Sequence, residues 1–288
     1  MQLRRLLAPT DFSTRSELSV NRAALLCRHF NAELQLLHVV DDDQPASVVD
    51  QETQQARSFL EGMAAEVSAG LDIPPKAIVK AGDPFQEIVR IASDNGADLI
   101  AMGAHRKRIL RDVFVGTTIE RVMRTGNHPV LMVNSELESP YRRILVATDM
   151  SDASANALRT AKALGFLDEA TVSLIHAFEP LARGMMIHAN IDREKIEEHI
   201  VQELSRTRQK IADFISKNEL GDLQYDLRLE DGPTFQSIKS AIDKEQPDLL
   251  IIGTRGLSGA KRILLGSIAD AVLREVECDI LAVPPRPK

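Results

Sequence analysis

The chain has 288 residues, 44% hydrophobic and 27% charged, which suits two ordinary packed domains and argues against a disordered chain. Its formal net charge of −7 argues against nucleic acid or an anionic membrane as the main partner. No run approaches the roughly 18 apolar residues of a membrane span, and no secretory signal is evident. Cys27 and Cys278 both lie in apolar patterns, which favours reduced thiols over a disulfide. We therefore expect a cytoplasmic protein.

Short apolar runs alternate with runs of helical periodicity along the first half of the chain. The predicted strands are Arg4–Ala8, Glu33–Val40, Lys76–Ala81, Asp98–Met102 and Val130–Val133. The predicted helices are Ser16–Phe30, Gln51–Gly70, Pro84–Asn95 and Thr117–Arg124. This alternation is typical of an α/β fold, a parallel sheet covered by helices on both faces.

The second half repeats the first. Asp11 and Asp149 stand in matching Thr-Asp-x-Ser turns, 138 residues apart. Later matches are 150 residues apart and comprise the pairs Gly82 and Gly232, Gly103 and Gly253, and Gly116 and Gly266. The 12 extra residues are best placed in Glu179–Asp192, ahead of a long helix predicted over Asp192–Lys217. We therefore predict two repeated, doubly wound, five-stranded parallel-sheet domains over residues 1–134 and 142–288, with a polar linker over 135–141.

The last strands of the two repeats, Val130–Val133 and Ile280–Val283, are apolar on both faces. A bare apolar edge strand promotes aggregation, so these strands need a partner. We predict that the two domains dock through them as a pseudo-twofold pair. The alternative is that a second copy of the chain covers them, which leaves homodimerisation open.

A glycine-rich bend follows the strand predicted at Pro247–Ile252 and leads into a helical run that starts at Ser267. Glycines at such a bend can adopt positive φ and let a ligand approach the backbone. The amide groups of a helix N-terminus attract phosphate. The spacing excludes a P-loop and the G-x-G-x-x-G dinucleotide fingerprint. The residues alone leave two alternatives, a phosphate site and a tight turn before a capped helix.

In parallel sheets of this kind, ligands bind where the strands end, at the point where the strand order reverses. Both the Thr-Asp turn and the glycine-rich bend follow strands, so we expect them to meet in one crevice in each half. For Asp149 two roles stay open, ligand contact and N-cap of a helix that starts near Ser151. His38 and His176 end matching strands and are interpreted as structural histidines.

The spacing of Gly253, Gly256, Gly266 and Ser267, with the Thr-Asp-x-Ser turn, resembles the universal stress protein (UspA) family in its tandem two-domain form. The resemblance implies an adenine nucleotide alpha hydrolase-like fold and ATP binding in the second domain, with Mg²⁺ an open addition through the phosphates. The contacts that it implies there are Thr148, Asp149, Ala177, Gly253, Gly256, Gly266, Ser267 and Ile268. Arg255 would add positive charge near the phosphates.

The first domain departs from the family pattern, because Arg106 replaces the second glycine of the bend. Its weaker site candidates are Asp11, Val39, Gly103, Gly116, Thr117 and Thr118. Two outcomes are open: weaker binding of an anion or nucleotide, and a degenerate structural partner. We favour the degenerate partner.

No catalytic motif stands out among the seven histidines and two cysteines. The leading hypothesis is therefore a cytoplasmic stress-response or regulatory protein that binds ATP and acts through ligand-dependent conformation rather than turnover. One alternative is an adenylate-forming or nucleotidyl-transfer enzyme on a related fold. A ligand-free scaffold is the other. The sequence does not identify the stress or a protein partner.

Overall fold

A computed structural model describes residues 2–104, 117–178, 192–255 and 265–286. Within these ranges ten strands form one sheet in the order β3-β2-β1-β4-β5-β10-β9-β6-β7-β8. The strands are β1 (Arg5–Pro9), β2 (Glu33–Val40), β3 (Lys76–Ala81), β4 (Leu99–Gly103), β5 (Val130–Val133), β6 (Arg143–Ala147), β7 (Thr171–Phe178), β8 (Asp226–Asp231), β9 (Leu249–Gly253) and β10 (Asp279–Val283). The helices are α1 (Thr14–Phe30), α2 (Ala46–Val67), α3 (Pro84–Asp94), α4 (Thr118–Thr125), α5 (Asp152–Ala163), α7 (Arg193–Lys217), α8 (Thr234–Glu245) and α9 (Ser267–Glu275).

The strand order of the first half is repeated in the second, so the predicted pair of doubly wound domains is confirmed. All strand pairs inside each half are parallel. The switch in strand order falls between β1 and β4 in the first half, and between β6 and β9 in the second. Each candidate crevice should therefore lie at the carboxyl ends of one of these strand pairs.

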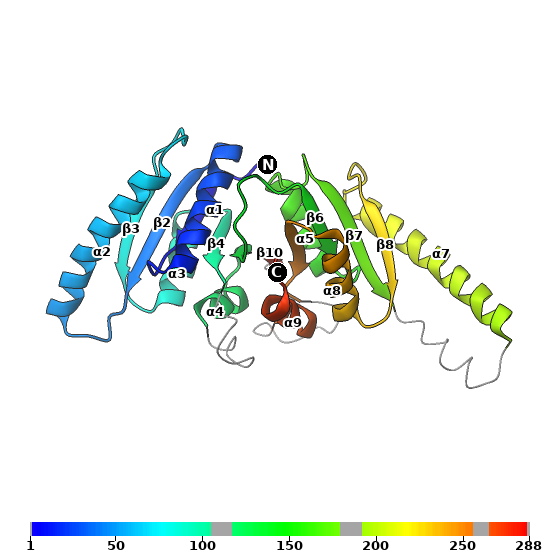
Figure 1. The fold of residues 1–288 in the computed structure, drawn as a ribbon. Helices are drawn as coiled ribbons and strands as arrows, with labels where there is room; N and C mark the ends of the chain where they lie inside the picture. Colours follow the sequence, from blue (N-terminus) through cyan, green and yellow to red (C-terminus); the bar gives the residue numbers. More distant parts are fainter. Residues whose placement is uncertain (1, 105–116, 179–191, 256–264, 287–288) are drawn as a thin grey trace.

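The two halves join through their last strands, as predicted. β5 and β10 pair antiparallel, with Met132 opposite Ile280 and Leu131 opposite Leu281. All four of these side chains are buried. The pairing makes the sheet continuous and leaves β3 and β8 as its outer edges, with α2 and α7 at opposite ends of the molecule (Figure 1).

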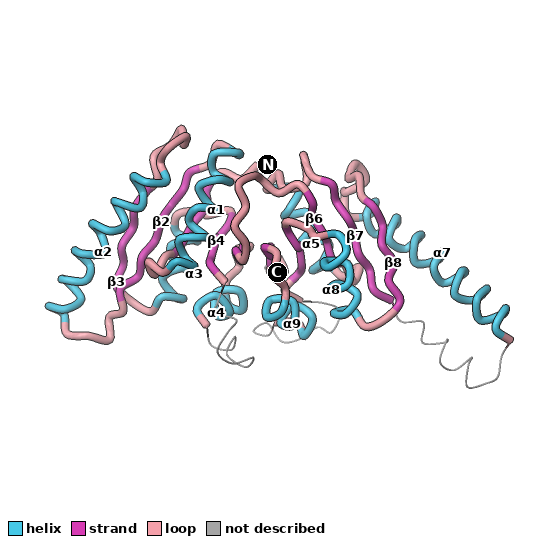
Figure 2. Tube along the Cα trace, viewed as in Figure 1, coloured by secondary structure: helices cyan, strands magenta, loops and turns pink. Residues whose placement is uncertain are grey.

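Each face of the sheet is covered by helices from both halves (Figure 2). The core on one face contains buried residues of α1, α2, α5 and α7, and the core on the other contains those of α3, α4, α8 and α9. Strand residues alternate between the cores, as Leu6 and Leu7 of β1 illustrate. Buried parallel strands of this kind read as continuous apolar runs, which is why their positions were predictable.

Two helices differ from expectation in detail. α2 begins at Ala46, five residues before the predicted Gln51, because Pro45 stands at its N-cap with a φ of −56° and starts the helix earlier. In α7, Ile211 and Ile215 are buried, whereas the predicted apolar positions nearer its start, Ile196, Ile200 and Leu204, are only half-buried. The predicted insertion lies outside the described residues except for Asp192. None of the helices in the described ranges combines the length and apolarity needed to cross a bilayer.

Candidate functional site

The turn after β6 is built by its own side chains. The Thr148 amide donates to the Ile175 carbonyl at 3.0 Å, which ties the turn to β7. The Thr148 hydroxyl accepts from the Met150 amide at 3.0 Å, and Met150 adopts a φ of +60°. The Asp149 carboxylate accepts from the amide and the hydroxyl of Ser151. These bonds explain why Thr, Asp and Ser recur at this spacing.

Asp149 is not the N-cap of α5. That position is occupied by Ser151, whose hydroxyl accepts from the Ser154 amide at 3.3 Å. The capping alternative for Asp149 was therefore wrong, because Asp149 lies two residues before the N-cap and its carboxylate bonds to Ser151 inside the turn. Asp149 is half-buried at the carboxyl end of the sheet.

The repeated histidines support these turns. Nδ1 of His176 lies 2.8 Å from the Thr148 carbonyl oxygen, and Nδ1 of His38 lies 2.8 Å from that of Thr10. Each ring therefore fixes the carbonyl of the residue that precedes the turn's aspartate. The structural role predicted for both histidines agrees with this geometry.

The glycines of the bend differ from the conformation expected of them. Gly253 is not in the left-handed region, and a Cβ there would lie 3.1 Å from the Ala153 backbone. Gly266 has a φ of −65°. The expectation of positive φ was wrong for these two, because Gly253 instead allows α5 to approach the end of β9. Gly256 lies outside the described residues.

α9 begins at this bend without a side-chain cap. Gly266 is its N-cap residue and Ser267 its first helical residue. The Gly266 amide donates to the Thr254 carbonyl at 2.9 Å, while the Thr254 amide donates to Val283 at 2.9 Å. Thr254 thus joins the start of α9 to β10 and holds the helix N-terminus beside the carboxyl end of β9.

A cavity of about 250 Å³ opens between this helix start and the turn after β6. Its described walls are Ala147, Thr148, Asp149, Ser154, Ile175, Ala177, Thr234, Ile238, Ile252, Gly253, Arg255, Gly266, Ser267, Ile268 and Ala269. Every predicted second-half residue that the structure describes is in this set. Sequence reasoning missed Thr234 and Ile238 of α8. The available signal was Gly232, the match of Gly82, because it lies in the turn between β8 and α8 that brings α8 to the same edge of the sheet.

The corresponding turn in the first half is also closed by its own side chains. The Asp11 carboxylate accepts from the amide and hydroxyl of Ser13 and from the Ser16 hydroxyl at 2.7 Å. Partial burial alone would raise the pKa of Asp11, but these hydrogen bonds outweigh it and hold the pKa below its usual value. The hydroxyls of Thr10 and Ser16 lie 3.0 Å apart, and in the second half the Ser154 hydroxyl accepts from the Thr148 hydroxyl at 3.1 Å.

The remaining first-half candidates surround the same turn. The Thr117 hydroxyl caps α4 by accepting from the Glu120 amide at 3.3 Å, unlike the uncapped start of α9. A Cβ on Gly103 would lie 2.3 Å from the Arg15 carbonyl oxygen, so this glycine is required by packing. Val39, the second-last residue of β2, and Thr118, the first residue of α4, are both half-buried. Gly116 lies outside the described residues.

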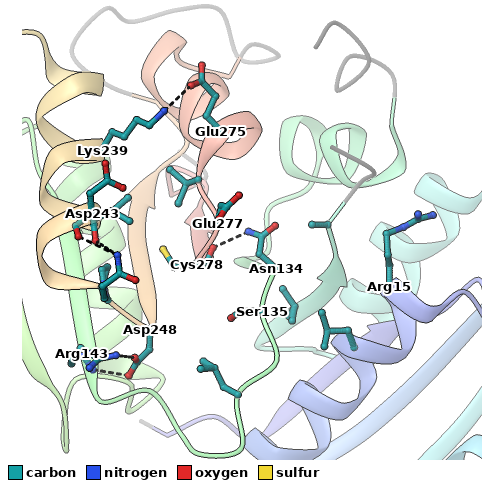
Figure 3. A pocket seen from close by; sticks show the side chains of 18 residues that line it. Arg15, Asn134, Ser135, Arg143, Lys239, Asp243, Asp248, Glu275, Glu277 and Cys278 are labelled. Carbon is teal, nitrogen blue, oxygen red and sulfur yellow. Dashed lines mark hydrogen bonds and ion pairs between the residues drawn. The ribbon is translucent and has the colours of Figure 1, made fainter. Parts of the chain in front are cut away.

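A larger cavity of about 880 Å³ lies between the two halves (Figure 3). Charged groups on its wall pair with one another, Lys239 with Glu275 at 3.6 Å and Arg143 with Asp248 at 3.0 Å. None of the predicted site residues is among its described lining. The members of these two pairs are directed at each other, and the predicted site residues line the smaller cavity, which makes the smaller cavity the better candidate site.

Comparison with known proteins adds the family to this geometry. The model of the universal stress protein family matches residues 2–134 and again residues 140–284. The chain belongs to the universal stress protein family. Because the family match occurs twice, this is a tandem member, as the repeated turns and glycines indicated.

Individual relatives agree with this assignment. Universal stress protein E of Escherichia coli K12 is 24% identical over 240 residues, covering 81% of this chain and 72% of that protein. Universal stress protein MJ0577 of Methanocaldococcus jannaschii is 30% identical over 153 residues, covering 45% of this chain and 94% of that protein. The crystal structure of a universal stress protein from Archaeoglobus fulgidus has a TM-score of 0.71 at 21% identity and covers 99% of this chain and 100% of that one, which shows the shared fold.

Proposed function

We propose that this universal stress protein binds ATP in the cavity of its second half. The observation that carries the proposal is the uncapped start of α9, whose first residues Ser267 and Ile268 line a cavity that also contains Asp149 and Ala177. The first amides of a helix have no intrahelical acceptor and carry the positive end of its dipole. A phosphate group supplies the acceptors and the negative charge that such a helix start lacks.

The remaining walls suit the other parts of an adenine nucleotide. Ile175, Ala177, Ile238 and Ile252 form an apolar side that fits a planar base, with the Ala177 main chain at its edge. The Asp149 carboxylate, held by Ser151, would accept from ribose hydroxyls. Arg255 adds positive charge on the phosphate side, and Mg²⁺ would enter through the phosphate oxygens.

We propose binding rather than turnover as the output. Among the described lining residues, Asp149 is the one carboxylate and histidine is absent, so these residues offer little to position an attacking water. A bound nucleotide would instead join α8, α9 and the turn after β6, and partners would respond to that arrangement. We place this regulatory, stress-related role in the cytoplasm and divide the chain into domains 1–134 and 142–288.

We propose the first half as a degenerate partner. Thr117 already caps α4, and Asp11 already accepts three hydrogen bonds from Ser13 and Ser16. A nucleotide arriving there would have to replace bonds that the protein makes for itself, and such an exchange brings little net free energy. The second half offers α9 without the corresponding cap.

Calorimetric titration of the full chain with ATP and Mg²⁺ tests the function. We expect one ATP per chain and a melting temperature that rises with ATP, because a ligand at 100 times its Kd stabilises the native state by about 2.7 kcal/mol. AMP and GTP titrations distinguish recognition of the phosphates from recognition of the base. No binding heat and an unchanged melting temperature at millimolar ATP would leave a ligand-free scaffold, and release of AMP or pyrophosphate over many turnovers would identify an enzyme.

A further inference from the structure

A buried carboxylate stands where the two halves meet. Asp279, the first residue of β10, is 0% exposed. Its Oδ1 accepts from the amides of Asn134 and Ser135 at 2.9 and 3.0 Å, and its Oδ2 accepts from the Tyr141 hydroxyl at 2.7 Å. Nε of Arg22 lies 3.3 Å from Oδ2 in an ion pair. Asp279 belongs to the second half, whereas Arg22, Asn134 and Ser135 come from the first half and the start of the linker.

The cation of this network is buried as well. Arg22 of α1 is 3% exposed, its guanidinium lies 5.2 Å from the centre of the Tyr141 ring, and its Nη1 donates to the Ser139 carbonyl at 3.3 Å. Burial and the adjacent carboxylate raise the pKa of Tyr141 well above its usual value, so the phenol remains a donor. Beside the network, Nδ2 of Asn134 donates to the Cys278 carbonyl at 2.8 Å (Figure 3).

The network occurs on one side of the pseudo-twofold axis only. At the 138-residue offset Arg22 corresponds to Thr160, and at the 150-residue offset Asp279 corresponds to Pro129. The equivalent positions at the other corner therefore carry neither a cation nor a carboxylate. Two identical halves could not build this arrangement, because it needs one member from each repeat.

The backbone amides that donate to Asp279 are also absent from the equivalent positions of the other repeat. Asn134 and Ser135 correspond to Pro284 and Pro285, which have no N–H to donate. The corner that contains these prolines is closed differently, with Nδ2 of Asn156 donating to the Pro284 carbonyl at 2.8 Å. The two corners of the interface thus have different chemistry although the strand pairing through β5 and β10 is pseudo-symmetric.

We propose that the network of Arg22, Asn134, Ser135, Tyr141 and Asp279 determines which halves pair. It stabilises the pairing of a first half with a second half and destabilises the pairing of two first halves or of two second halves. The partner that the last strand of each half accepts is therefore the other repeat of this chain, not the equivalent repeat of a second copy. Specificity of this kind comes from penalising the wrong pairs as well as stabilising the right one.

The penalties follow from the residues that would face each other. Two second halves would bury two Asp279 carboxylates opposite Thr160, with prolines in place of both amide donors. Two first halves would bury two Arg22 guanidinium groups opposite Pro129. A buried charge without its partner is strongly destabilising, whereas removing both charges together is often nearly neutral.

The deciding experiment measures which halves pair when both are free to associate. A protease site inserted between the exposed residues Glu138 and Ser139 is cleaved in the folded full-length protein, which is then unfolded and refolded as an equimolar mixture of its two fragments. Native mass spectrometry separates the three pairings by mass. We expect the wild-type fragments to form first–second pairs and no detectable like pairs.

A neutralised variant, Arg22→Met with Asp279→Asn, removes both charges and keeps an acceptor for the two amides. We expect like pairs to rise to at least about a tenth of its assembled fragments. A matched control, Arg142→Met with Glu169→Gln, removes a surface ion pair whose side chains are 53% and 61% exposed and should pair as wild type. Like pairs from wild-type fragments, or strict first–second pairing by the neutralised variant, would overturn the proposal.

Thermal unfolding of the intact chain covers the case in which the fragments do not refold. Arg22→Met alone and Asp279→Asn alone each leave one buried charge without its partner, so each should lower the melting temperature more than the neutralised variant does. Melting temperatures that fall additively, with the double variant lowest, would contradict a coupled charge pair and with it the proposed basis of selection.

Discussion

Matched substitutions at the two helix starts test the binding proposal most directly. Ser267 begins α9, which has no side-chain cap, whereas Thr117 caps α4 through the Glu120 amide. Ser267→Ala should therefore remove a phosphate contact and leave stability nearly unchanged. Thr117→Ala should remove a cap and leave ATP affinity unchanged. The two residues occupy equivalent positions of the repeat, so each serves as the control for the other.

The expected magnitudes follow from these contacts. A hydrogen bond to a charged group contributes about 1.5 kcal/mol or more, so Ser267→Ala should weaken ATP binding about tenfold. Loss of an N-cap costs about 1 kcal/mol, which for a chain of this size lowers the melting temperature by about 2 °C in Thr117→Ala. Calorimetric titration and thermal unfolding of both variants measure the two quantities. If Ser267→Ala loses stability but keeps its ATP affinity, the uncapped helix start is not a phosphate site and the reasoning is refuted.

Three further predictions concern stability and reactivity. Gly103→Ala should destabilise the protein by about 3 kcal/mol, since the added Cβ would lie 2.3 Å from a backbone oxygen. Gly253→Ala should destabilise it less, since its Cβ would lie 3.1 Å from backbone atoms. Urea unfolding ranks the two variants, and the reverse order would contradict the packing role of these glycines. The pKa of Asp11 is lower in the folded chain than in the unfolded chain, so its ionised carboxylate stabilises the fold above the unfolded pKa, and this stabilisation is lost as the pH falls through the folded pKa. Between about pH 5 and pH 3 the free energy of unfolding should therefore fall less steeply in Asp11→Asn than in wild type. Parallel curves would argue against this assignment. Burial raises the pKa of Cys27 to about 12. At about pH 8 a thiol reagent should therefore modify only the half-buried Cys278 in the folded chain, and both cysteines after unfolding. Fast modification of both thiols in the native state would contradict the burial of Cys27.

The fold could be predicted because its strands, its duplication and its domain pairing each correspond to a different sequence pattern. Apolar runs located β2, β3 and β5 with their observed bounds, and the repeat offsets gave the duplication. The docking of β5 with β10 followed from two strands apolar on both faces. The start of α2 was missed because Pro45 can end a loop or begin a helix, and the choice depends on how the following turn packs.

The site was predictable as a set of residues but not in its conformations. The turn around Asp149 and the helix start at Ser267 were both expected at one edge of the sheet, and both line the cavity. The reason for Gly253 was not visible, because the approach of Ala153 depends on the packing of α5 against β9. The network around Asp279 also escaped prediction, since Asp279 lies 138 residues or more along the chain from Tyr141, Ser135 and Asn134.

The antiparallel contact of β5 with β10 has a consequence for how this protein can change over time. In an assembly of two identical subunits, every substitution is expressed twice, so a change that spoils one pocket spoils both. Here the two candidate sites are encoded separately within one chain, and each can be altered while the other keeps its residues. Arg106 in one bend and Gly256 in the other are a difference that a symmetric pair could not contain.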